Sequence, residues 1–169
     1  MNKQFWRFFI SIPAAAVIYM PLVLLLLEFH RIPLVEFSWL RFGIAFILLW
    51  GGIMLVMWAY LKLTKEGNAR FVLRLPTTKL VKDGPYQFIR NPIAVGTGAI
   101  LLGEAIYFAS WYLLIWTLIV IEVMAYHITH VEEYKLANKF GQEYVNYKMD
   151  VGRWFPKWNV FRQLFKKKK

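Results

Sequence analysis

The chain has 169 residues, of which 59% are hydrophobic and 18% aromatic, with a mean hydropathy of +0.42 and a net charge of +11. A soluble domain is about 45–50% apolar, so this composition predicts an integral membrane protein. A basic nucleic-acid binder would lack apolar runs long enough to cross a bilayer, so we expect no nucleic-acid partner and assign the charge to a membrane surface. The absence of cysteine excludes disulfides, thiolate metal sites and cysteine nucleophiles.

Four apolar runs predict an all-α membrane protein with four transmembrane helices in a single domain, residues 1–169. A crossing needs about 20 residues, and the runs occupy about residues 6–27, 40–63, 92–108 and 111–130. The first run contains Pro13 and Pro21, which membrane helices tolerate. It lacks a small-residue cleavage site, so we expect a retained helix rather than a signal peptide. The last two runs are separated by two residues and are expected to form a helical hairpin.

Basic residues predict which side of the membrane each segment faces. Seven lysines and arginines lie in residues 62–91 and ten follow His130, whereas the tip of the hairpin has none. Four spans with both termini in the cytoplasm put both basic segments on the cytoplasmic side. We therefore expect the chemistry to be assembled from two cytoplasmic pieces, about residues 64–91 and 131–161.

The first cytoplasmic piece ends in a well-marked helix start, with Asn91 at the N-cap position and Pro92 at the first helical position. Such a start presents free N–H groups and a positive dipole end, which together with Arg90 would hold a carboxylate or a phosphate. An ordinary capped helix explains the same residues. Gly96 and Gly98 follow within two turns, and they would let either a ligand or a neighbouring helix approach the backbone closely.

A polar stripe is predicted on the last span and its continuation. At 100° per residue, five polar residues fall within about a quarter of the helix circumference: Glu122, Tyr126, Thr129, His130 and Glu133. A carboxylate at membrane depth is costly and usually faces a bundle interior or a watery cavity. Glu122 and Glu104 therefore indicate a polar cavity, and two hydrogen-bonded glutamates that fix helix register are the alternative. Three histidines without a clear further ligand predict no metal site.

After Glu133 the pattern predicts an amphipathic helix that ends at Arg153-Trp154-Phe155-Pro156. Its apolar face contains Leu136, Phe140, Tyr144, Tyr147 and Val151. The tail from Trp158 onward combines aromatic residues with a lysine cluster. That combination suits the surface of an anionic leaflet, and a solvated charged tail is an equally good interpretation.

Three blocks of residues occur together over about residues 79–156. The first is Gly84-Pro85-Tyr86 with Arg90-Asn91-Pro92 and Gly96, the second is Glu132-Glu133, and the third runs from Phe140-Gly141 through Tyr144, Tyr147 and Val151 to Arg153-Trp154 and Pro156. In order and spacing these blocks resemble the integral-membrane methyltransferases that include isoprenylcysteine carboxyl methyltransferases and phospholipid N-methyltransferases.

The resemblance implies an S-adenosylmethionine-dependent methyltransferase whose cofactor binds at the cytoplasmic mouth of the last two helices. The implied cofactor-binding residues are Arg90, Asn91, Gly96, Gly98, Glu132, Glu133 and Tyr144. The cofactor's carboxylate suits Arg90 and the helix start, whereas its ammonium and hydroxyl groups suit the two adjacent glutamates. The methyl acceptor, a lipid or a lipidated molecule, is expected to enter laterally from the bilayer.

Three residues are candidates for the chemistry at the acceptor: Glu122, His130 and Arg153. If the acceptor is an amine, a carboxylate near the stripe would hold its ammonium and help to remove the proton. If the acceptor is a carboxylate, Arg153 would bind it through a bidentate pair. The identity of the acceptor stays open at this point.

The blocks depart from the family pattern at four positions. Asn91 stands where many members have His, Ala94 where they have Tyr, Asp150 where the isoprenylcysteine enzymes have Arg, and Gly152 where Pro is common. These departures disfavour an isoprenylcysteine acceptor and favour a lipid amine or another amphiphile. They also leave a rival hypothesis open, a non-catalytic lipid-binding or scaffolding protein that keeps the fold. A small transporter has less support because the chain shows no internal repeat.

Overall fold

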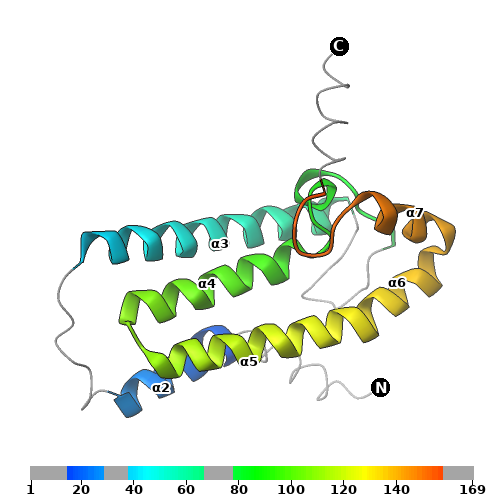
Figure 1. The fold of residues 1–169 in the computed structure, drawn as a ribbon. Coiled ribbons are helices and arrows are strands. Elements are labelled where there is room, and N and C mark those ends of the chain that lie inside the picture. The colour runs from blue at the N-terminus through cyan, green and yellow to red at the C-terminus, as the bar shows by residue number, and fades with distance from the viewer. Residues whose placement is uncertain (1–14, 29–37, 67–77, 158–169) are drawn as a thin grey trace. The chain divides into compact units, whose positions relative to one another are not determined.

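The computed structural model describes residues 15–28, 38–66 and 78–157, and these residues form helices and connections without a strand. The elements, in chain order, are η1 Ala15–Tyr19, α2 Met20–Glu28, α3 Trp39–Lys65, η2 Gly84–Gln87, α4 Pro92–Phe108, α5 Trp111–His127, η3 Ile128–Glu132, α6 Glu133–Phe140 and α7 Gln142–Asp150 (Figure 1). The predicted first span is helical from Ala15 onward. Its start, and the predicted tail from Trp158, lie outside the described residues.

The predicted helix at 92–108 has the same bounds as α4, and the one at 40–63 lies within α3. The helix of the last predicted span begins at Trp111 as expected and does not stop where the apolar run ends at residue 130, in agreement with the amphipathic helix predicted to follow it. It continues through η3 and α6 to Phe140 as one long helix (Figure 1). Among the described residues, α3 and this Trp111–Phe140 helix are long and apolar enough to cross a membrane, whereas α4 has 17 residues.

The large apolar side chains of these two helices are mostly exposed. Ile47 is 70% exposed, Trp111 74% and Leu118 59%. Only 17% of the apolar window of α3 and 22% of that of the Trp111–Phe140 helix are buried within the protein. The core helix of a soluble protein would hide such residues, so these surfaces require a surrounding apolar phase. This arrangement indicates an integral membrane protein.

The chain divides into two compact units. The first consists of residues 1–52 and 97–123, and it is held by a close seam between α3 and α4. A Cβ atom on Gly103 would lie 2.8 Å from Cγ of Leu49 and 3.2 Å from the carbonyl oxygen of Ala45. The rings of Phe42 and Tyr107 meet edge to face at 5.3 Å along the same seam. Small residues therefore bring these two helix backbones together.

The second unit, residues 53–96 and 124–169, contains two apolar clusters. One cluster joins the end of α3 to the loop before α4, and the other joins α6 to α7. Their buried members are Ala59, Val81 and Tyr86 in the first, and Tyr144, Tyr147 and Val151 in the second. The hydroxyl of Tyr147 donates a 2.6 Å hydrogen bond to the carbonyl of Tyr86 and links the clusters.

The predicted continuous amphipathic helix after Glu133 is wrong in one respect. The chain turns at Gly141, where φ is +54°, so that α6 ends at Phe140 and α7 begins at Gln142. Glycine adopts this conformation without the penalty that a Cβ atom imposes. The predicted apolar residues still gather in one cluster, because the turn folds α7 back beside α6 rather than extending the helix.

Candidate active site around Glu133

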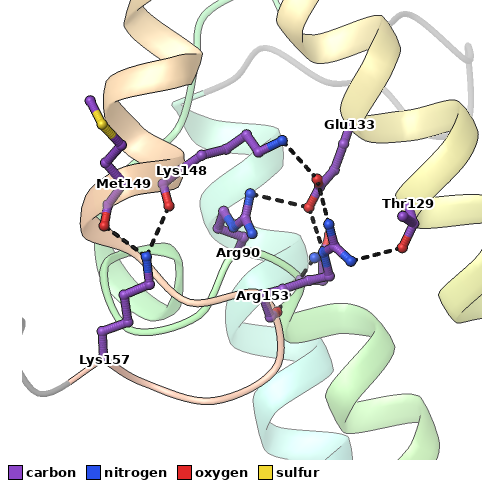
Figure 2. Close-up of polar contacts among 8 residues, drawn as sticks. Arg90, Thr129, Glu133, Lys148, Met149, Arg153 and Lys157 are labelled. Carbon is purple, nitrogen blue, oxygen red and sulfur yellow. Dashed lines mark hydrogen bonds and ion pairs between the residues drawn. The ribbon is translucent and has the colours of Figure 1, made fainter.

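A buried carboxylate, that of Glu133, lies among three cationic side chains (Figure 2). Its side chain is 4% exposed. Nε and Nη2 of Arg153 donate to its two oxygens at 2.8 and 2.9 Å. Nη1 of Arg90 lies 3.1 Å from Oε1, and Nζ of Lys148 lies 3.2 Å from Oε2. One negative group thus faces three positive ones, and the cluster as a whole is positively charged.

Arg153 is held in a fixed orientation by two residues of one helix. Its third nitrogen, Nη1, donates a 3.0 Å hydrogen bond to the hydroxyl of Thr129, which lies four residues before Glu133. Side chains with this spacing share a helix face, and Figure 2 shows both reaching toward the guanidinium. The bidentate edge of Arg153 is therefore already engaged with a carboxylate of the protein itself.

Backbone contacts bring the loop before α4 against the segment that carries Arg153. The amide of Arg90 donates to the carbonyl of Gly152 at 2.8 Å, and Ile89 and Gly152 form a parallel bridge. The side-chain amide of Asn91 donates to the carbonyl of Arg153 at 3.4 Å. A Cβ atom on Gly152 would lie 1.9 Å from the carbonyl oxygen of Phe155, so only glycine fits there. This packing explains the departure from Pro at that position.

Lys157 fastens the other end of the same segment. Its Nζ donates to the carbonyls of Lys148 and Met149 at 3.1 and 2.7 Å, at the end of α7 (Figure 2). A cation at a helix C-terminus satisfies free carbonyls and interacts favourably with the helix dipole. The turn that presents Arg153 is thus held on both sides.

Arg90 combines burial with unused donor capacity. Its side chain is 9% exposed, and Nε is buried without a hydrogen-bond partner among the described residues. It borders a cavity of about 60 Å³ that is lined by Leu63, Leu80, Val81, Tyr86, Arg90, Leu136, Tyr144 and Tyr147. Ligand pockets usually measure about 300–1,000 Å³, so this cavity has room for water rather than for a nucleotide.

The three tyrosines at this cavity are uncharged at neutral pH. Burial raises the pKa of Tyr144 to about 12, and burial also raises the pKa values of Tyr86 and Tyr147. Tyr144, which the resemblance implies as a cofactor ligand, is 2% exposed and belongs to the apolar cluster between α6 and α7. The structure therefore places Tyr144 in the core, where it lines the same small cavity as Arg90.

The predicted polar stripe divides into two rows. Glu122, Tyr126 and His130 are exposed, whereas Thr129 and Glu133 turn toward Arg153. The cause is η3, a π-helical turn over Ile128–Glu132, which has more residues per turn than an α-helix. Each residue of this turn rotates by less than 100° about the helix axis. Residues after Ile128 therefore lie at smaller angles around the helix than the count of 100° per residue predicts. Such turns occur frequently at functional sites.

The same turn aligns Tyr126 with His130. Their rings stack with centroids 4.3 Å apart, and Nδ1 of His130 lies 3.0 Å from the carbonyl oxygen of Tyr126. On the neighbouring side of the helix, Nδ1 of His127 lies 3.5 Å from the carboxylate of Glu132. Glu132 is half-exposed, in contrast to the buried Glu133.

The structure brings together three predicted site residues, Arg90, Glu133 and Arg153, with Asn91 beside them. Glu132 is half-exposed and pairs with His127 instead of with the cations of this cluster, and Gly96 is buried within α4. Glu122 and Gly98 belong to the first unit. A Cβ atom on Gly98 would lie 3.6 Å from the side chain of Ile121, an ordinary packing distance. This contact matches the interpretation of that glycine as a helix-packing residue.

One member of the cluster, Lys148, was missed in the sequence. It lies one helical turn after Tyr144 on α7, so its position on the inward-facing side of that helix was readable from the spacing. The pairing of Lys148 with Glu133 could not be predicted from the sequence, because the two residues are on different helices separated by the turn at Gly141.

Residues 40–143 match the phospholipid methyltransferase family. The chain belongs to this family. The match covers more than half of the chain, from the start of α3 into α7, and includes both Arg90 and Glu133; it confirms the resemblance seen in the sequence blocks. A comparison with curated proteins gave no match. As a family member with exposed apolar helices, the chain is a membrane-associated methyltransferase.

Proposed function

We propose that this phospholipid methyltransferase family member transfers a methyl group from S-adenosylmethionine to a membrane-embedded lipid acceptor, and that the acceptor atom is an amine nitrogen. The observation that carries the proposal is the buried cluster around Glu133, in which three cations face one carboxylate. A surplus of positive charge beside the start of α4 suits an anionic group of a ligand.

The charged groups around the cluster suit the amino-acid part of the cofactor, whose nucleoside would lie outside the small cavity beside Arg90. Arg90, with Nε buried and unpartnered, and the first N–H groups of α4 would hold the carboxylate of S-adenosylmethionine. Glu132, half-exposed and only loosely paired with His127, would accept hydrogen bonds from the ammonium or the ribose hydroxyls. When bound, the cofactor supplies a methyl group on a sulfonium, which is already activated for transfer.

Glu133 then has a different task from Glu132. Both of its oxygens are engaged by Arg153, with Arg90 and Lys148 close by, and it is 4% exposed. We assign it the role of a positioning residue that holds the two arginines, rather than that of a direct cofactor ligand. Such supporting contacts matter because a misplacement of about 1 Å at a site is costly to the rate.

The engagement of Arg153 also bears on the acceptor. A carboxylate acceptor would compete with Glu133 for the bidentate edge of this guanidinium, since Nε and Nη2 already donate there. An amine acceptor meets no such competition, and the exposed His130 lies beside Thr129, the residue that binds Arg153, on the same helix. The arrangement therefore supports an amine, and the acceptor's tails would stay in the bilayer and enter laterally.

The proposal includes four membrane spans with both termini and the Glu133 cluster on the cytoplasmic side, as the basic residues predict. The chain has no cysteine, so single-cysteine variants report topology without background. Lys82→Cys should react with an impermeant maleimide only from the cytoplasmic side, and Ala109→Cys only from the opposite side. Labelling of both positions from one side would contradict this topology.

The chemical test uses purified protein in nanodiscs of native lipid extract with methyl-labelled S-adenosylmethionine. Label in a lipid amine is the expected result. Base-labile label on an added prenylated peptide would contradict the amine, and the absence of label from every lipid and peptide would contradict the methyltransferase proposal.

Cofactor binding is tested separately by calorimetry with S-adenosylhomocysteine. Glu132→Ala should weaken binding about 10- to 100-fold, as expected for the loss of a charged hydrogen bond. Glu143→Ala is the matched control, because this exposed glutamate on α7 pairs only with Lys82 among the described residues. Equal affinities in the two variants would remove Glu132 from the cofactor site.

A further inference from the structure

Resting on the proposed function, we propose that His130 takes the proton from the acceptor's ammonium through Nε2, so that the neutral amine becomes the nucleophile. The observations are the hydrogen bond at the other ring nitrogen, the stacking of the ring on Tyr126, and the exposed position of the side chain. The hydrogen bond and the stacking constrain the ring, and the exposed position lets an acceptor reach Nε2.

The hydrogen bond fixes the tautomer of the neutral ring. Nδ1 of His130 lies 3.0 Å from the carbonyl oxygen of Tyr126, and a carbonyl oxygen only accepts hydrogen bonds. Nδ1 must therefore carry the hydrogen, which leaves the lone pair on Nε2. A backbone carbonyl on one ring nitrogen is a common way of presenting the other nitrogen for chemistry.

The stacking fixes the direction of the ring. The planes of Tyr126 and His130 are 26° apart, with centroids separated by 4.3 Å, and both side chains are exposed. This alignment depends on the π turn η3, because in a regular α-helix residues four apart are rotated by about 40°. The turn thus does two things at once, since it presents His130 outward and directs Glu133 inward.

The other titratable groups near this turn are engaged elsewhere. His127 pairs with Glu132, and Glu133 pairs with Arg153, Arg90 and Lys148. Arg153 is the charged group that reaches the turn from another segment, and it binds there to Thr129.

The proposed step is balanced in atoms and charge. Nε2 of His130 takes one proton from the lipid ammonium, and the freed nitrogen lone pair forms a bond to the methyl carbon as the carbon–sulfur bond breaks. The bonding electrons leave with sulfur, which becomes the neutral thioether of S-adenosylhomocysteine. The product is the lipid ammonium with one more methyl group on its nitrogen. The imidazolium of His130 afterwards gives its proton to water.

The first experiment needs no turnover. In nitrogen-15 NMR of histidine-labelled protein in nanodiscs, the neutral ring of His130 should carry its hydrogen on Nδ1. The chain has three histidines, so the His130→Asn spectrum assigns the signal. A neutral ring with the hydrogen on Nε2 would overturn the proposal, whatever the activity of the variants.

The second experiment measures methyl transfer to phosphatidylethanolamine nanodiscs. His130→Asn keeps a donor that reaches the Tyr126 carbonyl but has no Nε2, and general base catalysis is worth about 10²- to 10⁴-fold. We expect kcat to fall about 100-fold at pH 7 and the deficit to shrink at higher pH, where solvent deprotonates the amine. S-adenosylhomocysteine binding should stay unchanged. Lys135→Asn, at an exposed residue of α6, is the control and should behave as the unmodified protein.

The outcomes separate the two proposals. If the unmodified protein methylates the lipid and His130→Asn is slowed less than about twofold, the role of His130 is wrong while the function stands. If the unmodified protein transfers no label to any lipid, both fail. Should His130→Asn not bind S-adenosylhomocysteine, His130→Ala takes its place, and recovery of its rate with free imidazole is the expected result. Failure of that rescue would overturn the proposal.

Discussion

The seam of the first unit and the Glu133 cluster of the second unit join helices in different ways. At the seam, Gly103 of α4 packs against Leu49 and Ala45 of α3 through shape alone. In the cluster, Glu133 binds Arg153, Arg90 and Lys148 through charge. The seam depends on a residue without a side chain, Gly103, whereas the cluster depends on an ionised side chain, that of Glu133.

This difference teaches where the protein can tolerate change. Packing contacts are numerous and individually weak, so a seam loses stability gradually as its fit worsens. The cluster around Glu133 is more sensitive to the loss of one partner, because the buried Arg90 guanidinium would then lack its counter-ion. The site that the proposed chemistry requires is thus also the less forgiving part of the molecule.

The largest effect is expected from Glu133→Gln, which keeps the size of the side chain and removes its charge. Three cations would then lack their counter-ion, and breaking a buried ion pair costs about 3–5 kcal/mol. Chemical unfolding in detergent micelles measures the loss. Glu132→Gln is the control and should cost less than about 1 kcal/mol, because its pair is half-exposed. Similar losses in both variants would contradict the distinct roles of the two glutamates.

A smaller effect is expected at the seam from Gly103→Ala. The new Cβ atom would meet the backbone nitrogen of Leu49 at 3.1 Å and its Cγ at 2.8 Å, so the helices must move apart. Such overpacking costs about 1–3 kcal/mol. Gly51→Ala on α3 is the control, since no atom lies within 4 Å of its Cβ position. There the helix propensity of alanine should leave the midpoint of thermal unfolding unchanged or higher.

Tyr147→Phe sharpens the comparison, because it removes one neutral hydrogen bond from the second unit and leaves its ions untouched. The lost bond to the Tyr86 carbonyl is worth about 0.5–1.5 kcal/mol. Tyr134→Phe removes a hydroxyl from an exposed ring and should have no measurable effect on unfolding. A loss for Tyr147→Phe as large as that for Glu133→Gln would show that charge is not what makes the cluster sensitive.

The smallest effect at neutral pH is expected from Tyr144, whose buried phenol changes the stability only under alkaline conditions. Burial raises the pKa of Tyr144 from about 10 to about 12, so the folded state favours the neutral phenol. Its contribution to stability is complete below pH 10 and is lost as the pH rises from 10 to 12. The free energy of unfolding of the unmodified protein should therefore decrease as the pH rises over that range. Tyr144→Phe should make this decrease smaller. Identical pH profiles would contradict the buried phenol.

The helices could be predicted from apolar runs wherever a run and a helix end at the same place. The bounds of α4 were correct because Asn91-Pro92 marks its start and the residues after Phe108 break it. In the last span the apolar run ends at His130 and the helix does not, because polar residues continue it as α6, as the amphipathic pattern predicted. Apolarity reports a membrane boundary, and a helix crosses that boundary freely.

The sequence predicted part of the cluster around Glu133 and little of its geometry. Sequence blocks singled out Arg90, Glu133 and Arg153 because their types and spacing resemble the family. They did not show which of two adjacent glutamates is buried, because that depends on the rotation introduced by η3. A π turn has no simple sequence signature, so a count of 100° per residue placed Glu133 on the same row as His130.

The bridge between Ile89 and Gly152 has a consequence for biosynthesis. The nearby hydrogen bond between Asn91 and Arg153 joins residues 62 positions apart, with α4, α5, α6 and α7 between them. Since a ribosome delivers the chain from the N-terminus, the partners of Arg90 are complete only when every helix in that interval has been made. A nascent chain therefore has no completed cluster around Glu133, and under our proposal it cannot capture the methyl donor before its helices are in place.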